Sequence, residues 1–141
     1  MLRLIAAFLL VFSAATPAIA ATDIEIRIGG SSWATIDDDG TIRISGSSVG
    51  KFESGGTVRR SGSSVGRVTS DGTIYDSGSS VGRLDSDGTV RKSGSSIGKI
   101  DSDGTIRRSG SSWGRASSCS DHDDRRAVVA VLYFFNDDYF R

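Results

Sequence analysis

Residues 81–93 read Val-Gly-Arg-Leu-Asp-Ser-Asp-Gly-Thr-Val-Arg-Lys-Ser, and this stretch decides the fold because the chain repeats it. Gly88 ends a three-residue loop, since glycine takes the positive φ that a type I turn followed by a left-handed residue requires. Asp87 precedes that glycine and can bond its own backbone two residues on. The segments on either side of the loop are therefore predicted to pair as a β-hairpin.

The hairpin recurs with a period of 16 residues. A glycine followed by threonine and then isoleucine or valine marks each loop, at Gly40, Gly56, Gly72, Gly88 and Gly104. In this register one apolar pair meets across every hairpin: Ile36 with Ile42, Phe52 with Val58, Val68 with Ile74, Leu84 with Val90, and Ile100 with Ile106. The sequence predicts an all-β, pseudo-symmetric array of five hairpins over residues 24–115.

A second apolar position lies three residues before each pair, so simple alternation would place it on the wrong face of the strand. A glycine follows it in most copies, as Gly82 follows Val81, and glycine inside a strand often marks a bulge or bend. We therefore expect a bulge there. The terminal copies carry Trp33 and Trp113 at this position, which fits closure of the array at its ends.

A single hairpin is marginally stable in water, so the units must share a core. The short repeat leaves two arrangements open, a flower-like closed ring and a short stacked solenoid. The unit at residues 97–107, Ile-Gly-Lys-Ile-Asp-Ser-Asp-Gly-Thr-Ile-Arg, resembles the five-fold β-flower proteins, small exported bacterial chains that end in an apolar, aromatic segment. The resemblance implies a ring of five hairpins and brings no established activity.

Residues 127–135 form a continuous apolar run, Ala-Val-Val-Ala-Val-Leu-Tyr-Phe-Phe, after a polar insert at residues 117–126. Its β-branched and aromatic content favours a buried strand that closes the hairpin array, and a buried helix is the alternative. A docking or membrane-associating segment is a less favoured interpretation, because the repeat strands lack the tall apolar band of a membrane-spanning barrel.

Residues 1–20 have the features of a signal peptide: Arg3, an apolar stretch, and Ala18-Ile19-Ala20 as a cleavage signature. The predicted mature chain starts at Ala21 and forms one domain over residues 21–141. We expect a periplasmic or secreted protein with no transmembrane segment in the mature chain, since the apolar stretch is shorter than the roughly 20 residues that span a bilayer.

The outward face of the hairpins carries opposed basic residues, which destabilise a strand pair unless they are neutralised. The simpler interpretation is diagonal neutralisation by nearby carboxylates such as Asp85. The functional interpretation is a ring of cations that binds an anionic glycan, sulfate or phosphate. The candidate anion-binding residues are Lys51, Arg59, Arg83, Arg91, Lys99 and Arg107.

Other site chemistries are disfavoured. The Asp-rich loops lack the ligand spacing and terminal glutamate of a calcium-binding EF-hand, and turn chemistry explains them. One cysteine, Cys119, and one histidine, His122, do not complete a structural zinc set, so no metal or cofactor is expected. No nucleophile motif or paired acid in a pocket indicates an enzyme. In an oxidising compartment Cys119 could bridge two chains into a dimer.

Two function classes follow from these observations. The first is a structural or interaction module of the cell envelope or secretome, with a protein partner. The second is a module that binds an anionic glycan through the outward cations. Nucleic acid is not expected as a partner, because the chain is exported and no aromatic residues interleave with the basic ones.

Overall fold

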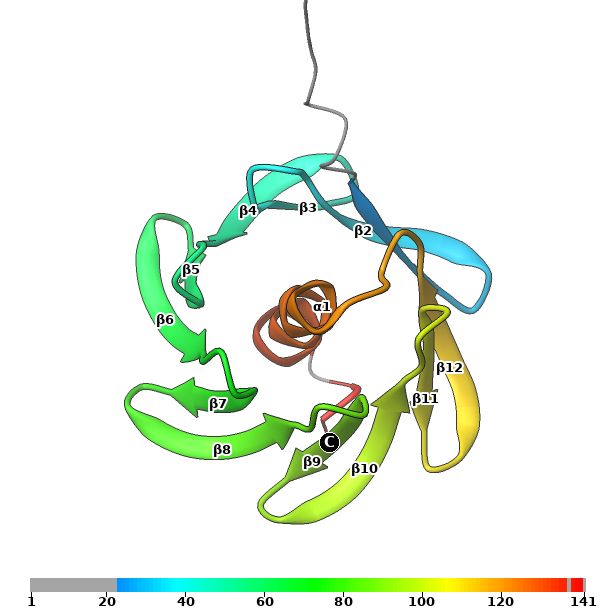
Figure 1. Ribbon diagram of the computed structural model, residues 1–141. Helices are drawn as coiled ribbons and strands as arrows, with labels where there is room; N and C mark the ends of the chain where they lie inside the picture. Colours follow the sequence, from blue (N-terminus) through cyan, green and yellow to red (C-terminus); the bar gives the residue numbers. More distant parts are fainter. Residues whose placement is uncertain (1–22, 137, 141) are drawn as a thin grey trace, which may run out of the picture.

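The structure, a computed structural model, describes residues 23–136 and 138–140, so the predicted signal peptide lies outside the described residues. Within them, twelve antiparallel strands form a closed barrel in which each strand pairs with its neighbours in the chain and β1 pairs with β12. Figure 1 shows the resulting ring of petals around a central helix. The strands are β1 (Ile24–Ile28), β2 (Ser31–Ile36), β3 (Thr41–Ile44), β4 (Ser47–Phe52), β5 (Thr57–Arg60), β6 (Ser63–Val68), β7 (Thr73–Asp76), β8 (Ser79–Leu84), β9 (Thr89–Lys92), β10 (Ser95–Ile100), β11 (Thr105–Arg108) and β12 (Ser111–Ala116).

The predicted hairpin register is confirmed. Leu84 of β8 lies opposite Val90 of β9, and both side chains are fully buried. The same pairing recurs in the other four predicted hairpins. Gly88 has φ of 94°, as the loop requires, and the Asp87 carboxylate accepts a hydrogen bond from the Thr89 amide at 2.9 Å. The repeated apolar pairs thus line the inside of the ring.

A second set of turns makes the petals. Ser45 and Gly46 join β3 to β4 with φ of 53° and 84°, the positive values of a type I′ two-residue turn. This Ser-Gly turn recurs in each later unit, and Gly29-Gly30 takes its place between β1 and β2. The described chain therefore holds six petals, and the predicted count of five units is short by one.

The sixth unit is made by the two ends of the array. β1 and β12 pair as Ile26 with Ala116 and Ile28 with Gly114. In every other unit an Asp-Gly or Gly-Gly loop connects the two paired strands, whereas no loop connects β1 to β12. Trp33 in β2 and Trp113 in β12 lie on the two strands that flank β1, which agrees with their predicted place at the closure. Closure by hydrogen bonds leaves no open sheet edge and selects the ring over the solenoid.

The predicted bulge is also present. Ile42 pairs with Gly50 and Arg43 with Ser48, so the intervening Val49 has no partner residue in β3. The same shift recurs in the other petals. A side chain at Gly66 would overlap the Phe134 ring, which explains the glycine at this position.

The prediction of a closing C-terminal strand is wrong, because the apolar run forms the helix α1 (His122–Phe135), which lies in the centre of the ring in Figure 1. Every ring strand already has two partners, so a strand at the centre would leave its backbone unpaired, whereas a helix bonds its backbone internally. Residues 126–132 are buried on all sides, as expected for a helix that is apolar all round. α1 also takes in residues 122–126 of the predicted polar insert.

Polar contacts fix α1 within the ring. Asp121 caps its first turn by accepting from the Asp124 amide at 2.8 Å. Arg126 is 6% exposed and donates to the backbone carbonyls of Val68 and Thr69 at 2.6 and 2.8 Å. After the helix, the chain turns back, and the buried Tyr139 donates its hydroxyl to the Arg107 carbonyl at 2.6 Å.

Candidate binding grooves on the outer face of the ring

The structure brings the predicted cations together in pairs. Lys51 lies opposite Arg59, Arg83 opposite Arg91, and Lys99 opposite Arg107 across neighbouring strands. In each pair the first residue is exposed and the second is half-buried. The equivalent position of the other strand pairs is more varied. Arg67 lies opposite Tyr75, Thr35 opposite Arg43, and Arg27 opposite Arg115.

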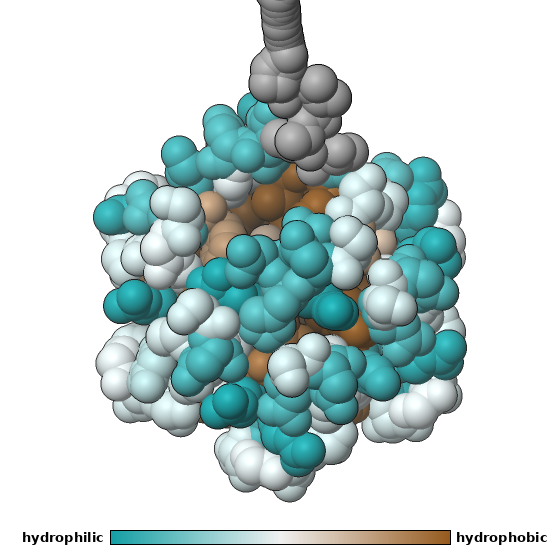
Figure 2. Space-filling model, viewed as in Figure 1, coloured by the Kyte–Doolittle hydropathy of each residue, from teal (hydrophilic) through white to brown (hydrophobic). Residues whose placement is uncertain are grey.

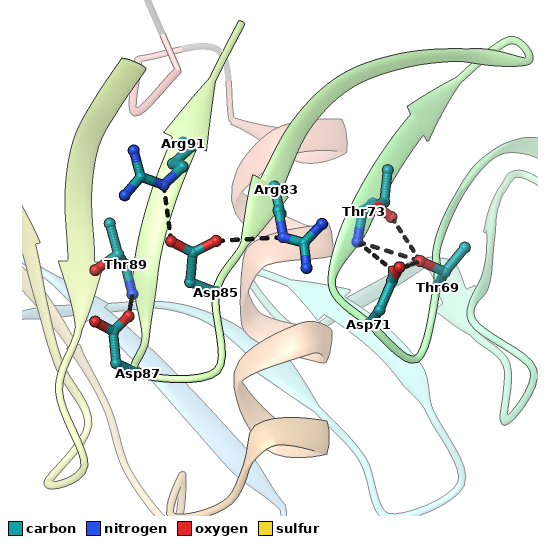
Figure 3. Close-up of polar contacts among 8 residues, drawn as sticks. All are labelled: Thr69, Asp71, Thr73, Arg83, Asp85, Asp87, Thr89 and Arg91. Carbon is teal, nitrogen blue, oxygen red and sulfur yellow. Dashed lines mark hydrogen bonds and ion pairs between the residues drawn. The ribbon is translucent and has the colours of Figure 1, made fainter. Parts of the chain in front are cut away.

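Carboxylates neutralise many of these cations, as the simpler interpretation expected. Asp85 lies between Arg91 and Arg83 and contacts their Nε atoms at 2.7 and 3.3 Å (Figure 3). This hydrogen bond and charge raise the pKa of Arg91. Equivalent pairs at 2.8 to 2.9 Å join Arg43 to Asp37, Arg59 to Glu53 and Arg107 to Asp101.

At this strand position, four exposed cations are left without such a carboxylate: Lys51, Arg67, Lys99 and Arg115. Within the described residues, none of the four has an acidic group at ion-pair distance. Lys51 and Lys99 act only at longer range, where each helps to lower the pKa of a turn aspartate, Asp39 or Asp87. Arg67 was not among the predicted residues, although its position matches Lys51 and Lys99 at the 16-residue spacing.

Three of these unpaired cations, Lys51, Arg67 and Lys99, each line a groove between neighbouring petals. The grooves have volumes of about 300, 370 and 270 Å³ at Lys51, Arg67 and Lys99 respectively. All three share one lining: a threonine, a serine, the bulged aliphatic residue, a glycine, the cation, its cross-strand partner, and the Ser-Gly tip of the next petal. The members at the first groove are Thr41, Ser48, Val49, Gly50, Lys51 and Arg59, with the tip at residues 61–62.

This repeated lining can bind a polar, negatively charged polymer. Hydroxyl groups offer hydrogen-bond donors and acceptors, the aliphatic residue offers apolar surface, and the cation offers charge. Arg83 and Arg91 differ from the other predicted site residues. Both form ion pairs with Asp85, and they line none of the three grooves. The candidate site is therefore the groove with its unpaired cation, repeated around the ring.

A larger pocket of about 600 Å³ opens beside the start of α1, with acidic residues around an apolar floor that includes Ile36 and Phe52. Figure 2 shows this apolar surface between the polar rim and the centre of the ring. Most of its carboxylates have partners in the protein: Asp37, Glu53 and Asp123 bind arginines, and Asp39, Asp121 and Asp124 cap a turn or α1. Their arrangement is accounted for by the fold.

The remaining candidates stand apart from the grooves. Cys119 is 4% exposed, and its burial, together with nearby Asp124, raises the pKa of the thiol to about 12. An intermolecular disulfide would need this sulfur to leave the core, so the structure disfavours the predicted dimer. In residues 23–136 and 138–140 no three His, Cys, Asp or Glu side chains are grouped as metal ligands, and no helix has the length and apolarity to cross a membrane.

Comparison of the chain with protein-family models, curated proteins and solved structures finds no match. The resemblance to the five-fold β-flower proteins therefore stays a prediction.

Proposed function

We propose that this protein is a non-enzymatic binding module that holds an anionic glycan in the repeated grooves between its petals. The observation that carries the proposal is the recurrence of one groove lining, each time with a cation that no carboxylate neutralises. In two of the grooves the neighbouring arginine, Arg59 or Arg107, is ion-paired, so the unpaired lysine is the cation that is available to a ligand. Export, expected from residues 1–20, would bring the grooves to a cell envelope or matrix where such polymers occur.

Repetition makes weak sites useful. A shallow groove with one cation binds a single sugar weakly, but a polymer that reaches several grooves gains from effective concentration, by about 10²- to 10⁴-fold over one site. Electrostatic attraction at an exposed site falls with ionic strength, because the Debye length is about 10 Å at 0.1 M salt. The proposal therefore requires salt-dependent binding that grows with polymer length.

The test compares two triple variants on immobilised polygalacturonate, heparin and neutral dextran. Lys51→Gln, Arg67→Gln and Lys99→Gln remove the unpaired cations of the three grooves. The matched control removes the same charge at three exposed, ion-paired arginines that line none of the three grooves: Arg27→Gln, Arg43→Gln and Arg83→Gln. Circular dichroism checks that both fold.

We expect the groove variant to lose about 10- to 100-fold in affinity for an acidic polymer, and the control to stay within about threefold of wild type. Equal losses in both variants would mean that net charge, not the grooves, drives binding. No binding of the wild-type protein to any of the polymers would reject the proposal and favour a structural module with a protein partner.

A further inference from the structure

The groove between the petals β5–β6 and β7–β8 differs from its two relatives. Tyr75 occupies the position that is Arg59 and Arg107 in the other grooves, and at 36% exposure it is the exposed large apolar side chain among the described residues. At about 370 Å³ its volume falls within the range of roughly 300–1,000 Å³ typical of small-molecule sites. This groove therefore has a ring surface that the others lack.

The substitution is coupled to a second one. In four other units the arginine at this position bonds a carboxylate six residues earlier in the chain, as Arg91 bonds Asp85. Here the residue six positions before Tyr75 is Thr69, whose hydroxyl contacts Asp71 and the Thr73 backbone instead. Figure 3 shows the two arrangements side by side. Both members of the ion pair are therefore absent from this unit.

Arg67 also lacks the carboxylate that holds Arg83. Asp85 neutralises Arg83 in the neighbouring unit, whereas the equivalent residue beside Arg67 is the uncharged Thr69. Arg67 lies directly across from Tyr75 in the strand register and from Thr57 on its other side. One row thus presents a hydroxyl, a guanidinium without an ion-pair partner in the described chain, and a half-exposed aromatic ring.

From this row we infer that the Arg67–Tyr75 groove is a specific subsite for a sugar ring that bears a carboxylate, the uronic acid residue of an acidic glycan. An arginine can hold a carboxylate through two parallel hydrogen bonds. A tyrosine presents an apolar face for the C–H face of a pyranose and a polar hydroxyl at its edge. Ser64, Ser77 and Thr57 line the same groove and offer hydroxyls to the sugar. This inference rests on the proposed function and names the sugar class that one groove selects.

The test uses the digalacturonate disaccharide, a probe short enough to reach one groove alone. Its binding at low salt is monitored through the amide chemical shifts of the protein. Thr69→Asp with Tyr75→Arg rebuilds the neighbouring pattern and should weaken binding by about 10- to 100-fold, the loss expected for a charged hydrogen bond and its ring contact. Asp85→Thr with Arg91→Tyr transplants the pattern to Arg83 and should add a second site, raising the stoichiometry from one to two. Galactobiose, the neutral analogue, should bind neither the Arg67 groove of the wild type nor the transplanted site at Arg83.

The outcomes separate this inference from the proposed function. If the disaccharide binds wild type and the rebuilt variant equally, or the transplant adds no site, the subsite is refuted. If the disaccharide fails to bind while the polymer still depends on the unpaired cations of the three grooves, the inference fails and the proposed function stands. If galactobiose binds as tightly as digalacturonate, the carboxylate plays no part and the inference is overturned.

Discussion

Replacing Arg126 with methionine should destabilise the protein by about 3–5 kcal/mol. Arg126 is 6% exposed, and its guanidinium donates to the backbone carbonyls of Val68 and Thr69. A hydrogen bond from a charged donor contributes about 1.5–3 kcal/mol, and a buried acceptor left unpaired adds a desolvation penalty. The contact of Arg126 with the Phe52 ring adds about 1 kcal/mol. Asp123 contributes little, because its side chain is 81% exposed.

The control is Arg125→Met at the adjacent position. Arg125 is only half-buried, and its Nε has no hydrogen-bond partner in the described residues. Its replacement should change the free energy of unfolding by less than about 0.5 kcal/mol, as for most partly exposed positions. Urea unfolding measures both variants, and thermal unfolding should show a melting temperature about 10–20 °C lower for Arg126→Met. A difference below about 1 kcal/mol between the two would refute the anchoring of α1 by Arg126.

Three further outcomes are expected. Gly66→Ala should destabilise strongly because its Cβ would overlap Phe134, whereas Gly55→Ala, with open space around it, should leave the urea midpoint unchanged. Hydrogen bonds lower the pKa of Asp71 to about 2, so its stabilisation is present above pH 3.8 and lost as the pH falls toward 2. The melting-temperature gap between wild type and Asp71→Asn should close over that range, and a constant gap would contradict the shift. Cys119 should react with a thiol reagent at pH 8 only on unfolding; rapid labelling of native protein would contradict its burial.

The hairpins could be predicted because their information is local. A glycine in a fixed loop position sets the register, and the register determines which side chains meet, so the pairs Leu84 with Val90 and Arg83 with Arg91 followed directly. The predicted count of five followed the loop glycines, which occur five times. The sixth unit has no such loop, because β1 and β12 come from the two ends of the array, so counting loops could not find it.

The helix could not be chosen from the apolar run alone. Residues 127–135 have strand-like composition, and the helix forms because the closed ring offers no free strand edge to a segment at its centre. Asp121 and Asp124, which cap the helix, were read as part of a polar insert. Tertiary context thus overrides local preference at this segment.

The candidate site was half predictable. The sequence located the outward cations and anticipated neutralisation by carboxylates, but it could not separate Arg83, which Asp85 contacts, from Lys51 and Lys99, which have no such contact. Arg67 and Tyr75 were not predicted because they do not form an opposed basic pair. The missing signal was the simultaneous loss of an arginine and an acid at Tyr75 and Thr69, which the 16-residue alignment displays.

The most direct test of the grooves as the binding surface is amide chemical-shift mapping of the purified protein with digalacturonate and with a longer oligogalacturonate. We predict that the short probe shifts the amides of Gly66, Arg67 and Tyr75, and that the longer one also shifts Gly50 and Gly98 in the related grooves. Shifts that gather instead at the acidic pocket beside α1, or no shifts at low salt, would contradict the account.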